Sequence, residues 1–166
     1  MNDGPAKAIL AKHGKSFYWA SFFLGKKLAL SAAKLYQFCR FVDDLADGNT
    51  KEKARELTII RKALEIGEKS GDIEVDKFIQ LAKENNIPLV AARELIDGML
   101  ADQTPARFRN TTELLRYSHA VAGTVGLMMC RILNCKHARA ESFAIDLGIA
   151  MQLTNIARDV LEDAEN

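Results

Sequence analysis

The chain has 166 residues and a formal net charge of +1, from 23 basic and 22 acidic side chains. This length fits one domain with a real core, and hydrophobic residues at 48% are too many for a disordered chain. The balanced charge gives no electrostatic basis for nucleic-acid binding, which needs a clustered basic surface. We therefore expect one folded domain that does not bind nucleic acid.

The sequence also carries signals about location. The N-terminus lacks the basic start and apolar run of a signal peptide, and no stretch reaches the roughly 18 apolar residues of a membrane span. Cys39, Cys130 and Cys135 lie in apolar surroundings without a paired spacing, which favours buried free thiols in a reducing compartment. We expect a cytoplasmic protein without a membrane span, whose contact with membranes would be peripheral.

Helical signals dominate the chain, because long spans lack both proline and strand-like alternation. The turn pair Gly48-Asn49, the pair Gly71-Asp72 and the run before Pro88 separate the expected helices. In chain order, the sequence predicts a short helix capped by Ser16, then helices over about 28–46, 51–69, 75–84 and 89–100, a loop around 103–110, a helix starting at Thr111 or Thr112, and a long helix over about 138–163. Residues 1–166 thus read as a single all-α domain.

The helix expected over 28–46 ends in acids. Asp43 and Asp47 are four residues apart and project from one face, with Arg40 one turn before Asp43. Neighbouring carboxylates repel unless a cation lies between them, and Mg²⁺ prefers carboxylate and phosphate oxygens. The alternative is a solvated helix end, although acids at a helix C-terminus oppose its dipole. This pair alone leaves both interpretations open.

The last helix carries a second acidic pair within a narrow polar stripe. At steps of four, three, four and four residues the stripe holds Gly148, Gln152, Asn155, Asp159 and Asp163. Most other positions are apolar, which is typical of a buried helix that lines a polar cavity, and Arg158 flanks the acids. The alternative is a buried amide pair followed by an exposed acidic tail. Two acidic pairs on different helices can hold Mg²⁺ against a diphosphate.

Four segments resemble the squalene/phytoene synthase family in order and spacing. They are Ser-Phe-Tyr at 16–18, the acidic segment 36–47, Tyr117 with 121–126, and the segment 152–163, so the resemblance covers nearly the whole chain. It implies an isoprenoid synthase-type bundle around a central cavity. It also implies a prenyltransferase of isoprenoid and carotenoid biosynthesis, which condenses two farnesyl or geranylgeranyl diphosphates head-to-head and releases diphosphate, as phytoene or squalene synthases do.

The resemblance assigns roles by matching position. Asp43, Asp47, Asp159 and Asp163 would bind Mg²⁺, with Asn155 as a further metal ligand, and Tyr117 would join these aspartates in the catalytic set. Diphosphate contacts would come from His13, Ser16, Tyr18, Arg40, Gln152, Asn155 and Arg158. These residue types suit the reaction, because metals and arginines stabilise the departing anion and aromatic faces stabilise an allylic cation.

Family members continue past the second acidic motif, whereas this chain stops at Asn166. The resemblance therefore implies that the C-terminal helices which close the cavity are lacking, in a fragment or in a naturally short protein. Self-association, or a partner that covers the exposed faces, would then be expected. The competing hypothesis is a non-catalytic relative that acts as an assembly or partner-binding module. The retained aspartates argue against it, since a scaffold has no reason to keep repelling carboxylates together.

Overall fold

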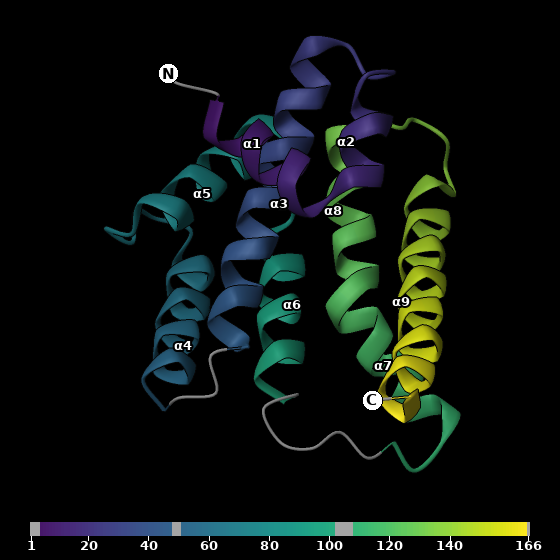
Figure 1. The fold of residues 1–166 in the computed structure, drawn as a ribbon. Helices are drawn as coiled ribbons and strands as arrows, with labels where there is room; N and C mark the ends of the chain where they lie inside the picture. The colour runs from purple at the N-terminus through teal and green to yellow at the C-terminus, as the bar shows by residue number, and fades with distance from the viewer. Residues whose placement is uncertain (1–3, 48–50, 102–107, 166) are drawn as a thin grey trace.

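The computed structural model describes residues 4–47, 51–101 and 108–165, and for residues 160–165 the backbone only. Figure 1 shows a bundle of helices, and the described ranges contain no strand, which confirms the all-α prediction. The elements are α1 (Gly4–His13), α2 (Lys15–Ser21), α3 (Lys26–Ala46), α4 (Lys51–Ile66), α5 (Ile73–Asn85), α6 (Leu89–Ala101), α7 (Thr111–Ser118), the π-helical turn η1 (His119–Gly123), α8 (Thr124–Ile132) and α9 (Ala140–Glu165).

Side-chain caps set the start of two of these helices. The Asp72 carboxylate accepts hydrogen bonds from the backbone N–H groups of Glu74 and Val75, at 2.8 and 3.0 Å, and so begins α5. Asn110 accepts from the N–H of Glu113 at 3.0 Å and begins α7. These bonds satisfy N–H groups that have no partner within a helix.

The prediction that Ser16 caps the second helix is wrong. Gly14 stands at the N-cap of α2, and Ser16 is the second residue of the helix. The reason is tertiary: a methyl carbon added at Gly14 would lie 3.0 Å from the ring of Tyr36, so the α1–α2 junction is pressed against α3. A side chain at this position would have to displace the Tyr36 ring, so glycine favours the close approach and the junction forms there.

The main core lies among α3, α4, α5, α6 and α8. Phe38 of α3 stacks on Phe78 of α5 with ring centroids 3.8 Å apart. Val42, Leu57 and Ile96 are completely buried around this pair. Met128 and Ile132 of α8 are also buried in this core. A smaller cluster joins α1 to α3 through Ala6, Leu10 and Ala33.

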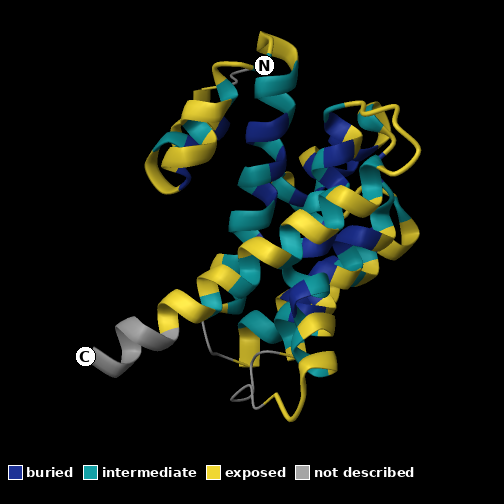
Figure 2. Cartoon of the chain, turned by 90° about the vertical axis from the view of Figure 1, so that its right-hand side faces the viewer, coloured by how far each residue is buried: buried dark blue, intermediate teal, exposed yellow. Residues whose placement is uncertain are grey.

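Helix α9 packs on α8 and η1 through two glycines. A methyl carbon added at Gly126 would lie 2.8 Å from the carbonyl carbon of Ala144, and one added at Gly148 would lie equally close to that of Ala122. Figure 2 shows no buried residue along the described side chains of α9, residues 140–159. The expectation of a buried helix is therefore wrong, because the described part of the chain covers only one face of α9.

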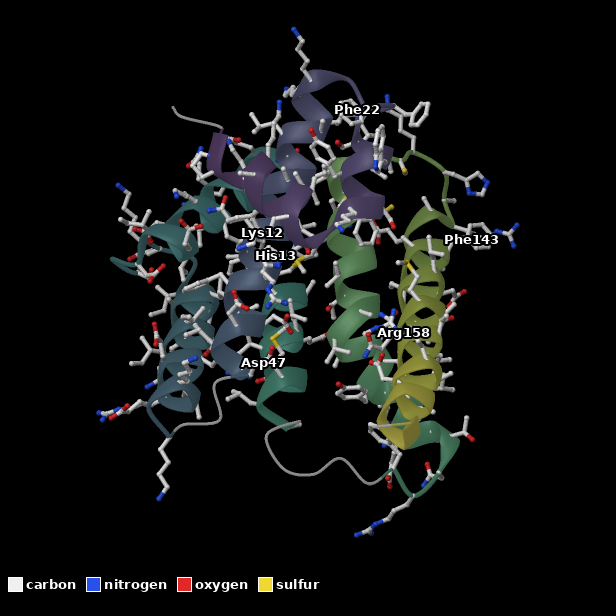
Figure 3. The ribbon with its side chains drawn as sticks, in the orientation of Figure 1. Lys12, His13, Phe22, Asp47, Phe143 and Arg158 are labelled. Carbon is white, nitrogen blue, oxygen red and sulfur yellow. The ribbon has the colours of Figure 1, made fainter. Side chains whose placement is uncertain are left out.

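Helices α3 and α9 run in the same direction, and Figure 1 shows both C-terminal ends at the lower end of the bundle. In Figure 3, Asp47 lies at the lower end of α3 and Arg158 on the lower half of α9. Both helices pack against α8. The fold thus brings the two acidic motifs to the same end of the molecule. Among the helices of the described residues, none combines the length and apolar character needed to cross a membrane.

Candidate active site

A cavity of about 180 Å³ opens beside the first acidic motif. One wall is a single face of α3, formed by Tyr36, Cys39, Arg40 and Asp43. These positions follow the three- and four-residue spacing that places side chains on one side of a helix. The opposite walls are apolar and come from three other elements, with Leu95 and Met99 on α6, Val121 on η1 and Val125 on α8. The cavity is therefore an apolar hollow with a charged rim.

Arg40 holds the rim together. Its Nη1 donates to Asp43 at 2.9 Å, and its Nη2 forms an ion pair with Asp44 at 2.5 Å. The Nε of Arg40 is buried without a hydrogen-bond partner among the described residues. A buried guanidinium N–H without an acceptor is costly, so this position favours an anionic or polar ligand at the cavity.

Burial raises the pKa of the Asp43 carboxyl above its ordinary 3.8, the negative charge of Asp47 raises it further, and Arg40 opposes the rise. Holding Asp43 ionised therefore costs free energy in the folded protein. A cation between Asp43 and Asp47 would remove this cost. Burial also raises the pKa of the Tyr36 phenol, and raises the pKa of the neighbouring Cys39 thiol to about 12. Tyr36 and Cys39 are thus neutral groups at neutral pH.

The π-helical turn η1 forms the side of the cavity opposite α3. Its Ala120 and Val121 press against Gly98 of α6, where an added methyl carbon would lie 2.8 and 3.1 Å from them. Thr124, which follows the turn, donates its hydroxyl to the carbonyl of Ala120 at 2.7 Å. Single π turns within α-helices are rare and occur frequently at functional sites. Here the turn directs Val121 to the cavity.

The segment with His13, Ser16 and Tyr18 reaches the cavity through Tyr36. Gly14 contacts the Tyr36 ring, and Tyr18 packs with Tyr36 against the α1–α3 cluster. His13 and Ser16 are exposed, and Tyr18 is half-buried. The fold therefore brings this motif next to the cavity wall without making it part of the lining.

The predicted residues of α9 and α7 lie outside the cavity lining. Gln152 is half-buried, and Asn155 and Asp159 are exposed. Arg158 donates two hydrogen bonds to Asp159, at 3.1 and 2.8 Å. Asp163 falls among the residues whose side chains the structure does not describe. Tyr117 of α7 is half-buried, with its ring centroid 5.2 Å from that of Phe108.

Among the described side chains, the acids of the two motifs form no preassembled metal cage. Within residues 4–47, 51–101 and 108–159, no three His, Cys, Asp or Glu side chains come close enough together to hold a metal ion. The donors at Asp43 and Asp47 nonetheless suit Mg²⁺, which is commonly bound by one or two carboxylates together with substrate phosphates. The residues present fit a metal that arrives with its ligand.

Sequence reasoning missed much of the lining. Tyr36 and Cys39 could have been found, because they precede Asp43 by seven and four residues and so share its helical face. Leu95, Met99 and Val121 carry no comparable signal, since an apolar residue in the lining looks like any core residue. The expectation of buried cysteines holds for Cys130. Cys39 is only half-buried, and Cys135 is exposed.

Comparison with known proteins agrees with this helical bundle. The family model described as squalene/phytoene synthase matches residues 10–166. Phytoene synthase of Pseudescherichia vulneris is 34% identical over 96% of this chain and 56% of its own length, and that of Thermus thermophilus is 37% identical over 95% and 54%. A crystal structure of a dehydrosqualene synthase matches 99% of this chain and 58% of its own, with 31% identity and a TM-score of 0.83.

The fold is that of the isoprenoid synthases, a helical bundle with the candidate site between its helices. The chain belongs to the squalene/phytoene synthase family. It spans about half the length of the curated relatives that it matches.

Proposed function

We propose that this chain contributes the two acidic motifs of a Mg²⁺-dependent prenyltransferase that condenses two allylic prenyl diphosphates head-to-head and releases diphosphate. The proposed substrates are farnesyl or geranylgeranyl diphosphate, and the product is of the phytoene or squalene type. The observation that carries the proposal is the rim of the cavity, where the half-buried Asp43 lies beside Asp47 and Arg40. Family membership supports the same reaction.

The α3 wall suits the two ends of a prenyl diphosphate. Arg40 lines the cavity beside the place proposed for the diphosphate, and its two terminal nitrogens hold Asp43 and Asp44 in place. Leu95, Met99 and Val125 provide apolar surface for the prenyl tail next to that rim. Such surface excludes water, which would otherwise trap an allylic cation.

In this proposal Mg²⁺ would be held by Asp43 of α3, by Asp47 at its C-cap, and by Asn155, Asp159 and Asp163 of α9. When bound, Mg²⁺ supplies positive charge to the departing diphosphate. Arg158 holds Asp159 through two hydrogen bonds and so orients one of these carboxylates. His13, Ser16, Tyr18, Gln152 and Arg158 are the proposed diphosphate contacts, and Tyr117 is the proposed aromatic group near the reacting carbons.

A binding assay tests the proposal without requiring turnover. Mg²⁺ together with a non-reactive farnesyl diphosphate analogue at 100 times its Kd should stabilise the fold by about 2.7 kcal/mol. The melting temperature should then rise by roughly 5–10 °C for a chain of this length. Asp43→Asn combined with Asp159→Asn should abolish the rise, because each acidic pair then loses one of its two carboxylates.

The matched control replaces two exposed acids away from the cavity, Glu56→Gln and Asp146→Asn, and should keep the full rise. An equal rise in the Asp43/Asp159 double variant would overturn the metal site. A chain that binds neither Mg²⁺ nor the analogue would instead fit a non-catalytic assembly module. Product formation from farnesyl or geranylgeranyl diphosphate would then identify the substrate.

A further inference from the structure

The α2–α3 turn exposes a group of aromatic side chains that the candidate active site does not use. Trp19, Phe22 and Phe23 are 69%, 63% and 93% exposed. The Phe22 ring centroid lies 5.7 Å from that of Trp19 and 5.1 Å from that of Tyr18, and Phe23 follows Phe22 in the chain. We call Trp19, Phe22 and Phe23 the aromatic tip. Three adjacent exposed aromatic rings are unusual on a soluble surface and mark an interaction site.

The aromatic tip lies in a segment whose charged side chains are all positive. Residues 4–42 contain no Asp or Glu, and their lysines and arginines are Lys7, Lys12, Lys15, Lys26, Lys27, Lys34 and Arg40. Lys26 and Lys27 directly follow the tip and are exposed in the first turn of α3. Exposed Trp and Phe side chains beside lysines are the composition of helices and turns that lie in a membrane interface.

A second connection at the same end of the bundle also carries exposed cations. Figure 1 shows the α8–α9 connection at the upper end, where the α2–α3 turn also lies. Lys136 and Arg139 of that connection are exposed, and the Arg139 guanidinium lies 5.2 Å from the centre of the half-exposed Phe143 ring. Glu141, the acid nearest to them in sequence, is paired with Arg131 at 2.7 Å.

The acids of the first motif, Asp43 and Asp47, lie at the far end. Figure 3 shows Phe22 at the upper end and Asp47 at the lower end, where α3 finishes. Helix α3 has 21 residues, so it separates these ends by roughly 30 Å. That distance exceeds the screening length of about 8 Å at physiological ionic strength, and an anionic surface at the upper end would not repel Asp43 or Asp47.

We propose that the aromatic tip and its lysines dock this protein on an anionic lipid bilayer, with Trp19, Phe22 and Phe23 inserted at the headgroup level. Negative lipids attract Lys26, Lys27, Lys136 and Arg139, and the rings bury their apolar surface in the interface. Ile59 and Ile66 of α4 are also exposed, but they stand among charged neighbours and form no comparable patch. The docking surface does not depend on the reaction proposed above.

The chain carries its own probe, because Trp19 is its single tryptophan. The full chain is mixed with vesicles of phosphatidylcholine containing 30% phosphatidylglycerol, an amount on the order of that in anionic membranes. We expect the Trp19 emission to shift to shorter wavelength and the protein to sediment with the vesicles. Phosphatidylcholine alone should bind much more weakly, and added salt should weaken binding to the anionic vesicles.

Two variants separate the roles of the rings and the charges. Phe22→Ser with Phe23→Ser should lower the apparent vesicle affinity by roughly a hundredfold, because burying each phenylalanine contributes roughly tenfold. Lys26→Glu with Lys27→Glu should lower it by roughly tenfold or more, since each lysine contributes severalfold at an anionic surface. The matched controls are Ile59→Ser with Ile66→Ser and Lys62→Glu with Lys83→Glu, all exposed positions on α4 and α5, and should bind like the wild type.

Three results would overturn the proposal. The first is a Trp19 emission that anionic vesicles leave unchanged. The second is a Phe22/Phe23 variant that binds vesicles as well as the α4 control does. The third is a Trp19 emission that is already at short wavelength without lipid and returns to longer wavelength when the protein is diluted, with a dimer detected by sedimentation. A second copy of the chain would then cover the tip.

Discussion

The contact between α9 and the π turn depends on Gly148, and a single methyl group tests it. In Gly148→Ala, the new carbon would lie 2.8 Å from the carbonyl carbon of Ala122 and 3.1 Å from the Cα of Gly123. Ordinary carbon contacts are about 3.5–4.0 Å, so α9 must move outward by roughly 1 Å. Both neighbours are backbone atoms that cannot rotate away, which puts the cost near the upper end of overpacking, about 3 kcal/mol.

Alanine regains about 1 kcal/mol of helix propensity over glycine, which leaves a net loss of about 2 kcal/mol. Thermal unfolding followed by circular dichroism should show the melting temperature lowered by roughly 4–8 °C. Gly25→Ala is the control, because no atom lies within 4 Å of a methyl carbon there, and its change should stay within about 1 kcal/mol. A Gly148→Ala variant as stable as the wild type, or more stable, would refute the close contact of the two helices.

Three further outcomes follow from burial and charge. Burial and the charge of Asp47 raise the pKa of Asp43, so its ionised carboxylate lowers the free energy of unfolding at pH 7. This free energy should rise as the pH falls from 7 towards 3.8, and Asp43→Asn should lack the rise in urea unfolding. Iodoacetamide at pH 8 should modify the exposed Cys135 within the native state and spare Cys39, whose pKa is about 12, and peptide mass mapping would contradict this by finding both labelled. Phe78→Ala removes the stack on Phe38 and should cost about 3–5 kcal/mol, whereas a loss below about 1 kcal/mol would disprove its central place in the core.

Sequence periodicity predicted the helices whose burial is one-sided. Helices α3, α4, α5 and α6 each present apolar residues at three- and four-residue intervals, and the structure buries those residues. The helix α1 had no such signal, since only Ala6 and Leu10 are buried in it. The bounds of α2 were also missed, because the packing of Gly14 on Tyr36 decides them and sequence spacing does not report it.

The candidate site divides in the same way. The pairing of Arg40 with Asp43 is local, so the three-residue spacing sufficed to predict a charged rim. The apolar walls depend on how α6, η1 and α8 pack on α3, and that packing is tertiary. The polar stripe of α9 predicts burial, but among the described side chains Asn155 and Asp159 are exposed. A narrow polar stripe fixes which residues share a face and leaves open what covers that face.

The π turn also has a consequence for protein engineering. A π turn holds one more residue than an α turn, so η1 acts as a one-residue insertion between α7 and α8. Successive residues of an α-helix are rotated by about 100° about the helix axis. Deleting Ala120 would therefore rotate α7 by roughly that angle relative to α8. Tyr117 would then leave its present face while Val125 kept its own. The number of residues in this turn thus determines how Tyr117 is oriented relative to the cavity.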